Sequence, residues 1–185
     1  MSRPCSSSLR DAIPLVPYDL VVNTFVKDAL SKGSMTLRYG GEMWRPLADV
    51  RDAARADIVL IQAEPAAVNE QIFNLVYQNF RISEVALRVR EALKSVGVSA
   101  DIRTDYSYKG VRNYRVSGQR RERALSFRPT ISIEESVQTM VHEIRRHGGV
   151  EFDNARYYNI RWMRLLEEAN KIIQVTGSVF DARGS

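Results

Sequence analysis

An arginine that closely follows a pair of glycines is the feature of this sequence best suited to chemistry. Gly40 and Gly41 permit a turn that residues with a Cβ resist. Arg45 comes next, and its planar guanidinium offers a fork of donors suited to a diphosphate or a carboxylate. Asp52 stands where a helix N-cap is expected, ahead of an alanine-rich segment. The spacing predicts a strand end, a glycine turn, an arginine-bearing strand and a helix, although an ordinary connection with a surface arginine would share that spacing.

The composition of the 185 residues is that of one globular domain, with 44% hydrophobic and 26% charged residues and a net charge of +5. No apolar run approaches the roughly 18 residues of a membrane span, and the N-terminus has no secretory signal, so we expect a cytoplasmic protein without membrane contact. Cys5 has no second cysteine with which to form an internal disulfide. His142 and His147 lack a zinc-binding pattern, so we predict neither a metal site nor a catalytic thiol.

The first half of the chain must supply the elements that position Arg45. Residues 1–17, with three prolines and a serine run, predict an irregular lead-in, and residues 18–185 predict a single α/β domain. An apolar stripe predicts a helix over 19–32, which Gly33 ends, and alternation predicts a strand over 35–39. In the helix after Asp52, we expect the inward residues to be Ala56, Val59, Leu60 and Ala63. A core strand is predicted over 71–76.

The second half predicts further helices and strands that alternate along the chain. Ser83 is expected to cap a helix that carries Val85, Val89 and Leu93 at four-residue spacing, and Gly97 is expected to close it. Strands are predicted over 100–104 and 114–116. Ser132 and Glu135 form a capping box for the next helix. A last helix is predicted over 160–175, with its inward residues being Leu165, Leu166, Ala169, Ile172 and Ile173.

The segment around Arg45 resembles the G-G-x-x-W-R-P-x-x-x-V-x-D-x-A-R-A stretch of the NAD-dependent epimerase/dehydratase family, the extended short-chain dehydrogenases that act on nucleotide sugars. The resemblance covers roughly residues 19–161. In that family the stretch lies in the second half of the protein, and the matching arginine binds the diphosphate of the sugar nucleotide. The resemblance therefore implies an α/β fold that corresponds to the C-terminal substrate-binding part, without the N-terminal Rossmann cofactor domain.

Two further substrate-binding candidates come from the same resemblance. Residues 19–26 look like the family's D-L-V-V-N-x-F-V helix, which implies that Asn23 faces the sugar nucleotide. A polar residue on the solvent side of an amphipathic helix is the competing interpretation of Asn23. Residues 112–117 resemble a segment that carries a second arginine for the diphosphate, which makes Arg112 the candidate there, with Lys109 as a competitor.

The sequence lacks both catalytic signatures of the family. No glycine-rich pyrophosphate loop follows a strand, and no Tyr-x-x-x-Lys occurs, so we predict no catalytic and no cofactor-binding residue in this chain. NAD is implied by the family but is not expected to bind this chain alone, and whether the chain is an enzyme by itself stays open. The expected partners are a nucleotide diphosphate sugar and either a separate chain with the Rossmann half or a second copy.

Two alternatives to an incomplete epimerase or dehydratase remain. One is a module that holds an anionic metabolite through Asn23, Arg45 and Arg112 without enzymatic ancestry in use. The other is a basic interaction or nucleic-acid-binding module built on the arginine-rich stretch 109–128 and its neighbouring tyrosines. No zinc-finger, RNP-like or basic-zipper pattern accompanies that stretch, so nucleic acid is the least favoured ligand.

Overall fold

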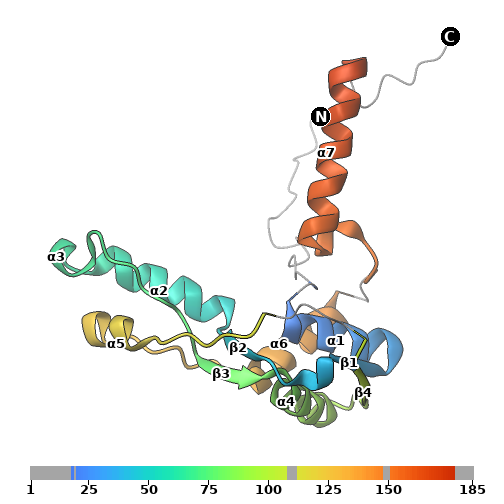
Figure 1. The fold of residues 1–185 in the computed structure, drawn as a ribbon, viewed down its shortest axis with the longest axis horizontal. Coiled ribbons are helices and arrows are strands. Elements are labelled where there is room, and N and C mark those ends of the chain that lie inside the picture. Colours follow the sequence, from blue (N-terminus) through green and yellow to red (C-terminus); the bar gives the residue numbers. More distant parts are fainter. Residues whose placement is uncertain (1–17, 19, 108–111, 148–150, 178–185) are drawn as a thin grey trace, which may run out of the picture.

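The computed structural model describes residues 18, 20–107, 112–147 and 151–177, and shows a helical body with two short sheets (Figure 1). Cys5 and Lys109 lie outside the described residues. Along the chain, the elements are α1 Val21–Lys32, β1 Ser34–Arg38, η2 Tyr39–Gly41, β2 Trp44–Leu47, α2 Val50–Gln62, α3 Pro65–Val68, β3 Gln78–Arg81, α4 Ile82–Ser95, β4 Asp101–Asp105, α5 Gln119–Leu125, α6 Ile133–Arg146, η3 Ala155–Tyr157 and α7 Asn159–Thr176. The predicted α/β class is confirmed.

The main core lies where α1, α4 and α6 pack against the strand pair β1 and β4. These two strands are parallel, with Ser34 opposite Asp101 and Arg38 opposite Asp105. The four-residue repeat predicted for α4 is confirmed, because Val85, Val89 and Leu93 are all fully buried. α6 supplies a matching face to this core through Ile133, Val137, Val141 and Ile144.

An ion pair fastens α4 to α6 at the edge of this core. Arg88 donates to both carboxylate oxygens of Glu134. Its Nε lies 2.6 Å from Oε1, and its Nη2 lies 2.8 Å from Oε2. The hydrogen bonds from Arg88 keep the pKa of the Glu134 carboxyl below its usual value, although partial burial acts against them. The two helices are therefore held in register by a forked contact as well as by apolar packing.

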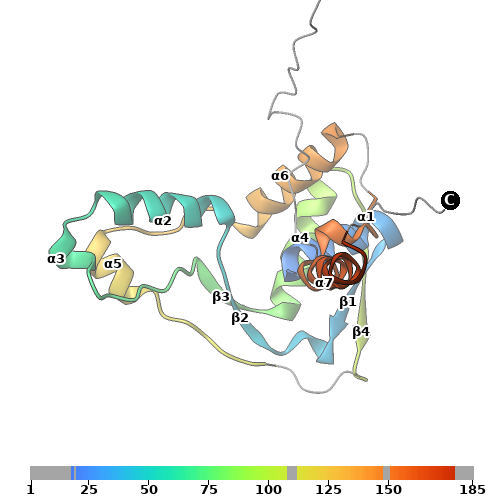
Figure 2. The same ribbon diagram turned by 90° about the horizontal axis from the view of Figure 1, so that it is seen from above.

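A second part of the fold extends away from the body as an arm that contains α2, α3 and α5 (Figure 2). The antiparallel pair of β2 and β3 leads into it, with Arg45 opposite Phe80. Arg121 of α5 is buried and joins three segments, because its guanidinium donates to the carbonyls of Phe127, Asn74 and Val76. Burial lowers the pKa of Arg121. This side chain therefore links α5 to residues 74–76 and to Phe127 within the arm.

The strand predicted over 71–76 is wrong. These residues have no regular secondary structure, and Ile72 is 80% exposed. The strand that does form is β3, a few residues later, where β2 offers an antiparallel partner. Apolar character alone does not make a strand, because backbone donors and acceptors need a neighbouring strand to pair with.

The strand predicted over 114–116 is also wrong, and a side chain explains the difference. The amide of Asn79 accepts from the backbone N–H of Val116 and donates to its carbonyl oxygen, both at 2.9 Å. Asn113 in turn accepts from the backbone N–H of Trp44 at 2.9 Å. Residues 112–117 are therefore fixed beside β2 and β3 by side-chain amides instead of by a backbone ladder.

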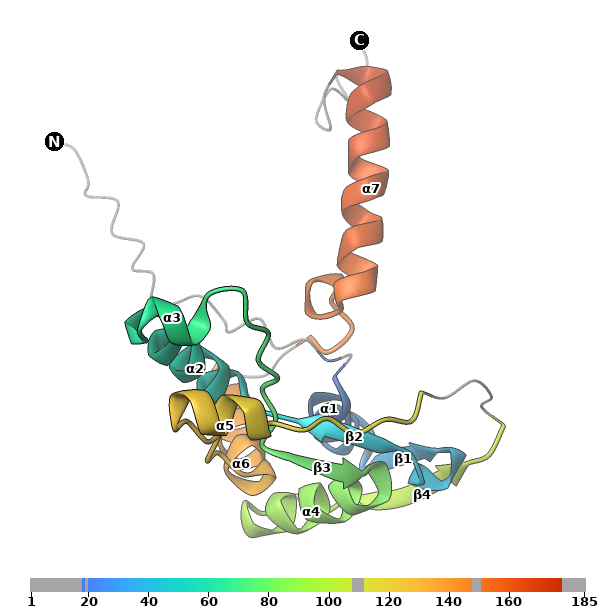
Figure 3. The same cartoon turned by 60° about the vertical axis from the view of Figure 1, so that its left-hand side comes forward.

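The last helix, α7, forms as predicted but not with the predicted burial. Figure 3 shows it projecting from the body. Leu165, Leu166, Ile172 and Ile173 are between 44 and 49% exposed, so the expectation that they face inward is wrong. α7 packs mainly on η3, and the described part of the chain offers no second helix to cover its apolar face. No helix among the described residues combines the length and apolar character that a membrane crossing requires.

Candidate functional site

An open cavity of about 1480 Å³ lies between α1, β1, β2, α6 and the segment around residues 112–114. The three residues predicted to bind substrate come from three separate parts of the chain: Asn23 from α1, Arg45 from β2 and Arg112 from the segment after β4. All three line this one cavity. Their convergence is a tertiary property, because 67 residues separate Arg45 from Arg112 in the sequence.

Arg45 is held in place from two sides. Its Nη1 donates to the carbonyl of Trp44 at 2.8 Å and also to the carbonyl of Arg112. The face of its guanidinium lies 5.2 Å from the centre of the Tyr114 ring. Within the described part of the chain, Nε and Nη2 have no hydrogen-bond acceptor. The side chain is therefore oriented before any ligand arrives, and it keeps a pair of donors that suits two oxygens of one anion.

The glycine turn ahead of Arg45 is confirmed, and the structure shows why two glycines are needed. Gly40 and Gly41 both have φ near +70°, at 66° and 73°. A Cβ on Gly41 would lie 2.7 Å from the backbone nitrogen of Ser83, at the start of α4. The turn therefore presses its backbone against the first turn of α4, which brings β2 and Arg45 to the cavity.

The helix that follows Arg45 begins three residues earlier than expected. Asp49, not Asp52, is the N-cap of α2, since its carboxylate accepts from the backbone N–H of Arg51 at 2.9 Å. Likewise Ser83 does not cap α4; the N-cap position there is Arg81, which makes no side-chain capping bond. Ser132 does cap α6, as predicted, by accepting from the N–H of Glu135. The carboxylate of Asp49 also accepts from the hydroxyl of Ser136, so the N-cap of α2 is joined to α6.

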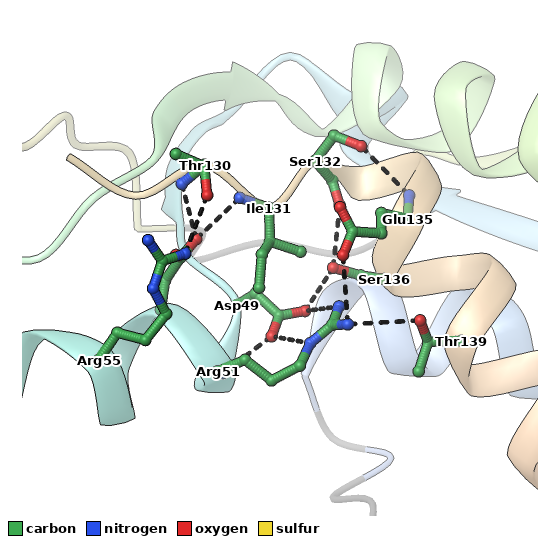
Figure 4. A network of polar contacts seen from close by, with 10 residues as sticks. Asp49, Arg51, Arg55, Thr130, Ile131, Ser132, Glu135, Ser136 and Thr139 are labelled. Atoms are coloured by element: carbon green, nitrogen blue, oxygen red, sulfur yellow. Dashed lines mark hydrogen bonds and ion pairs between the residues drawn. The ribbon is translucent and has the colours of Figure 1, made fainter.

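A polar network joins the start of α2 to the start of α6 (Figure 4). Arg51 contacts Asp49 through Nε at 2.9 Å, and its Nη1 lies 3.3 Å from Glu135 and 3.4 Å from Thr139. Ser136 donates its hydroxyl to Asp49. Burial of the Asp49 carboxyl acts to raise its pKa, but the hydrogen bonds from Arg51 and Ser136 outweigh burial and lower it to about 2. Asp49 is therefore ionised throughout the physiological pH range.

Asp52, the predicted cap, has a different structural role. It is fully buried, and its Oδ2 accepts from the backbone N–H groups of Thr130 and Ile131 at 3.0 and 2.9 Å. Its Oδ1 meets Arg55 at 3.1 Å. A carboxylate this deep needs such partners, because an unpaired buried charge is costly. Asp52 thus ties α2 to the segment that leads into α6, and it does not line the cavity.

Sequence reasoning missed several charged and aromatic residues of the cavity wall. Lys27, Arg38 and Arg51 add positive charge, and Tyr77 and Tyr114 add aromatic surface. Arg51 could have been found only with Asp49 recognised as the N-cap of α2, since the position of Arg51 follows from that cap. Tyr114 was not recoverable by pattern, since its segment was expected to be a strand. Six Lys and Arg side chains line the cavity together with four carboxylates, and Lys27 and Arg51 pair with two of these, Asp28 and Asp49. The remaining excess of positive charge favours an anionic ligand.

Among the residues that the structure describes, no element fits a dinucleotide. A pyrophosphate cradle needs a strand, a glycine-rich loop and then a helix N-terminus. Neither strand of the parallel pair supplies one: β1 runs into η2, where Gly41 is packed on Ser83, and β4 runs into the segment toward residue 107. Nor do three or more His, Cys, Asp or Glu side chains gather in metal-binding geometry among the described residues.

Comparison by sequence gives no match, either to protein-family models or to curated proteins. Comparison by structure does. DesIV, a dTDP-glucose 4,6-dehydratase from Streptomyces venezuelae solved with NAD and TYD bound, matches with a TM-score of 0.56 at 19% identity, over 78% of this chain and 42% of that one. TunA, an NAD-dependent NDP-hexosamine 5,6-dehydratase of tunicamycin biosynthesis, matches with a TM-score of 0.57 at 16% identity, over 74% of this chain and 42% of that one.

A GalE-like L-threonine dehydrogenase from Cupriavidus necator also matches, with a TM-score of 0.54 at 18% identity, over 65% of this chain and 44% of that one. The names of these three enzymes indicate different substrates, so the shared fold alone does not select a ligand. The chain spans about two-fifths of the length of each structure. It therefore has the fold of a part of the extended short-chain dehydrogenases of the NAD-dependent epimerase and dehydratase type.

Proposed function

We propose that this chain is the substrate-binding part of an NAD-dependent epimerase or dehydratase acting on nucleotide sugars, and that it is catalytically incomplete by itself. The observation that carries the proposal is the convergence of Asn23, Arg45 and Arg112 on one cavity. Three separate sequence motifs carry these residues, and only the fold brings them to the same cavity. The fold is also that of enzymes named as a dTDP-glucose 4,6-dehydratase and a UDP-glucuronic acid 4-epimerase, which is compatible with this class of ligand but does not select it.

In this proposal the diphosphate binds between the two arginines. Arg45 presents two donors from a side chain already oriented by the Tyr114 ring and by the carbonyl of Arg112. Ordering Arg45 in advance lowers the entropy that binding must overcome. Arg112 adds a second cation, and the amide of Asn23 can donate to an oxygen while it accepts elsewhere.

Chemistry on the sugar would need a second polypeptide segment. The family's reaction removes a hydride to a nicotinamide and later returns it, and the described elements of this chain include no cradle for that cofactor. We infer that the cofactor-binding part comes from a separate chain or from a further stretch of the same protein. On its own, the chain would bind its substrate without turning it over.

The test is the thermal midpoint of the purified chain with a panel of UDP- and dTDP-sugars, with NAD as a control. A ligand that binds only the folded state at about 100 times its dissociation constant adds about 2.7 kcal/mol, which raises the midpoint by several degrees. We expect such a rise with at least one sugar nucleotide and none with NAD. Arg45→Ala should weaken binding at least about tenfold, because a charge-assisted forked contact is lost.

Arg90→Ala is the matched control. Arg90 is an exposed arginine on α4 that pairs with Glu91 and does not line the cavity. If Arg90→Ala lowers affinity as much as Arg45→Ala, or if Arg45→Ala binds like the unaltered chain, the proposed site is wrong. A chain that responds to no member of the panel would contradict the proposed ligand class.

A basic interaction module remains the second candidate, although three arginines of the stretch make contacts within the chain. Arg121 is buried, Arg128 pairs with Glu122, and Arg115 stacks 3.9 Å from the centre of the Trp44 ring. Salt separates the two candidates. Binding to a polyanion through many cations weakens steeply as salt rises, whereas a two-arginine diphosphate site should respond less.

A further inference from the structure

The apolar face of α7 is continuous, and most of it is exposed. Its members recur at i, i+3, i+4, i+7, i+10 and i+11, which places them on one side of the helix. They are Trp162, Leu165, Leu166, Ala169, Ile172 and Ile173. The large members of this face are between 42 and 49% exposed. An uncovered apolar stripe of this length on an 18-residue helix marks a surface built for contact.

The base of α7 is fixed to the body, so the stripe is presented in a defined direction. The Tyr18 ring packs against Phe152 and Tyr157, with ring centres 5.5 and 5.4 Å apart, and the Tyr18 N–H donates to the Tyr157 carbonyl at 2.8 Å. Tyr158 donates its hydroxyl to the Phe152 carbonyl at 2.7 Å. Beyond this aromatic base the helix stands clear of the body, as Figures 1 and 3 both show.

The charges beside the stripe point to one kind of partner. One flank carries Arg161 and Glu168, seven residues apart, whereas the other flank carries the neutral Met163 and Asn170. Arg161 lies over the Tyr158 ring at 4.3 Å, close to the fixed base. Within the described part of the chain Glu168 has no ion-pair partner. When two such flanks lie side by side in antiparallel orientation, the positive residue of each lies beside the negative residue of the other.

We propose that α7 is a self-association helix that packs antiparallel against α7 of a second copy of this chain. In an antiparallel pair each flank lies beside the same flank of its partner, so Arg161 of each copy meets Glu168 of the other, twice by symmetry. In a parallel pair the charged flank would face Met163 and Asn170 and gain no ion pair. The antiparallel pair also brings Trp162 of each copy against Leu165 of the other.

This proposal is independent of the proposed function, because none of the residues of the α7 stripe lines the cavity. The pairing also explains why the stripe is wide. In the middle of the antiparallel pair, the stripe of one α7 packs on the stripe of the other. Toward the C-terminus of α7, Ile172 and Ile173 reach the base of the partner's helix. A face that contacts both a helix and the base beneath it needs more than a narrow coiled-coil seam.

The experiment measures the mass of the full chain in solution by analytical ultracentrifugation as a function of concentration. We expect a dimer. Leu165→Asp with Ile172→Asp should give a monomer whose thermal unfolding stays cooperative, because the main core does not include these residues. Glu167→Arg, on the opposite face of α7, is the control and should leave the dimer intact.

Charge exchange tests the orientation. Arg161→Glu alone, or Glu168→Arg alone, places like charges opposite each other and should weaken the dimer about tenfold. The double variant R161E/E168R restores opposite charges in an antiparallel pair and should dimerise within about threefold of the unaltered chain. A monomer at all concentrations, which would leave the stripe to another segment or another protein, overturns the proposal. A double variant as weak as the single variants also overturns it.

Discussion

At the scale of single residues, the two aspartates after Arg45 show how position in space decides what a carboxylate does. Asp49 and Asp52 are three residues apart, and both lie at the start of α2. Asp49 caps the helix and meets Arg51 and Ser136, whereas Asp52 is buried against the backbone N–H groups of Thr130 and Ile131. Together they attach α2 to the segment and helix that follow far along the chain, which keeps one wall of the cavity in place.

The lowered pKa of Asp49 predicts an acid-sensitive contribution to stability. Its value is about 2 in the folded chain against 3.8 for the unperturbed group, so the unfolded chain binds the proton more readily. The contribution is present above about pH 4 and is lost as the pH falls toward 2. Because Arg51 is 40% exposed and solvent screens the pair, we expect about 1 kcal/mol from ionisation.

Urea unfolding of the unaltered chain and of Asp49→Asn between pH 5 and pH 2 checks this prediction. The free energy of unfolding should differ by about 1–2 kcal/mol at pH 5, since the variant loses the ion pair and weakens the cap, and the two curves should converge toward pH 2. Parallel curves over the whole range would show that Asp49 does not titrate as described.

At the scale of elements, both the backbone angles and the packing of the turn before β2 require glycine. Gly40 and Gly41 adopt left-handed backbone angles, and Gly41 also touches the first turn of α4. β2 then pairs with β3, and β3 leads directly into α4. A short stretch of chain thus links the arginine strand to the main core.

Gly41→Ala tests this link, with Gly97→Ala as its matched control. Both glycines have a positive φ, at 73° and 76°, but a Cβ on Gly97 meets nothing within 4 Å, whereas on Gly41 it would lie 2.7 Å from Ser83. We expect a loss in unfolding free energy of about 1 kcal/mol for Gly97→Ala and about 2–4 kcal/mol for Gly41→Ala. Equal losses, measured by urea unfolding, would mean that α4 yields to the added methyl group.

At the scale of the whole molecule, the arm carries apolar surface that the described chain does not cover. α2 has one face, with Ala56, turned toward its own chain, and a second stripe at i, i+4, i+8 and i+11 that is exposed. Val50, Ile58 and Ile61 of this second stripe are 78, 54 and 83% exposed. A helix that is apolar on two faces is typical of a helix buried between two layers.

Substitution of the second stripe should therefore leave the isolated chain almost unaffected. We expect Ile61→Lys to change the unfolding free energy by no more than about 0.5 kcal/mol and to improve solubility, because it removes exposed apolar surface. Ala56→Lys on the opposite face should cost several kcal/mol, since it buries a charge. A loss above about 1 kcal/mol for Ile61→Lys in thermal or urea unfolding would show that the stripe is already covered in the free chain.

Local patterns in the sequence determined most of the helices and the turn that carries Arg45. Each of these features depends on residues only a few positions away, so the local sequence is enough to predict it. They are the apolar stripes of α1, α4 and α6, the cap at Ser132, the glycine ends at Gly33 and Gly97 and the strand that carries Arg45. The family resemblance likewise predicted the fold and three candidate residues, Asn23, Arg45 and Arg112, each from its own segment, and all three line one cavity.

Only the tertiary structure decided what depends on distant partners. Residues 71–76 have the apolar character of a strand but no strand beside them, and residues 114–116 are held by the amide of Asn79 instead. Asp49, and not Asp52, is the cap of α2, and Ser136 from another helix donates to its carboxylate. The stripe of α7 predicted burial, yet periodicity reports that a face is apolar and not what covers it. That information lies in the arrangement of segments far apart in the sequence, because burial requires a surface on the other side.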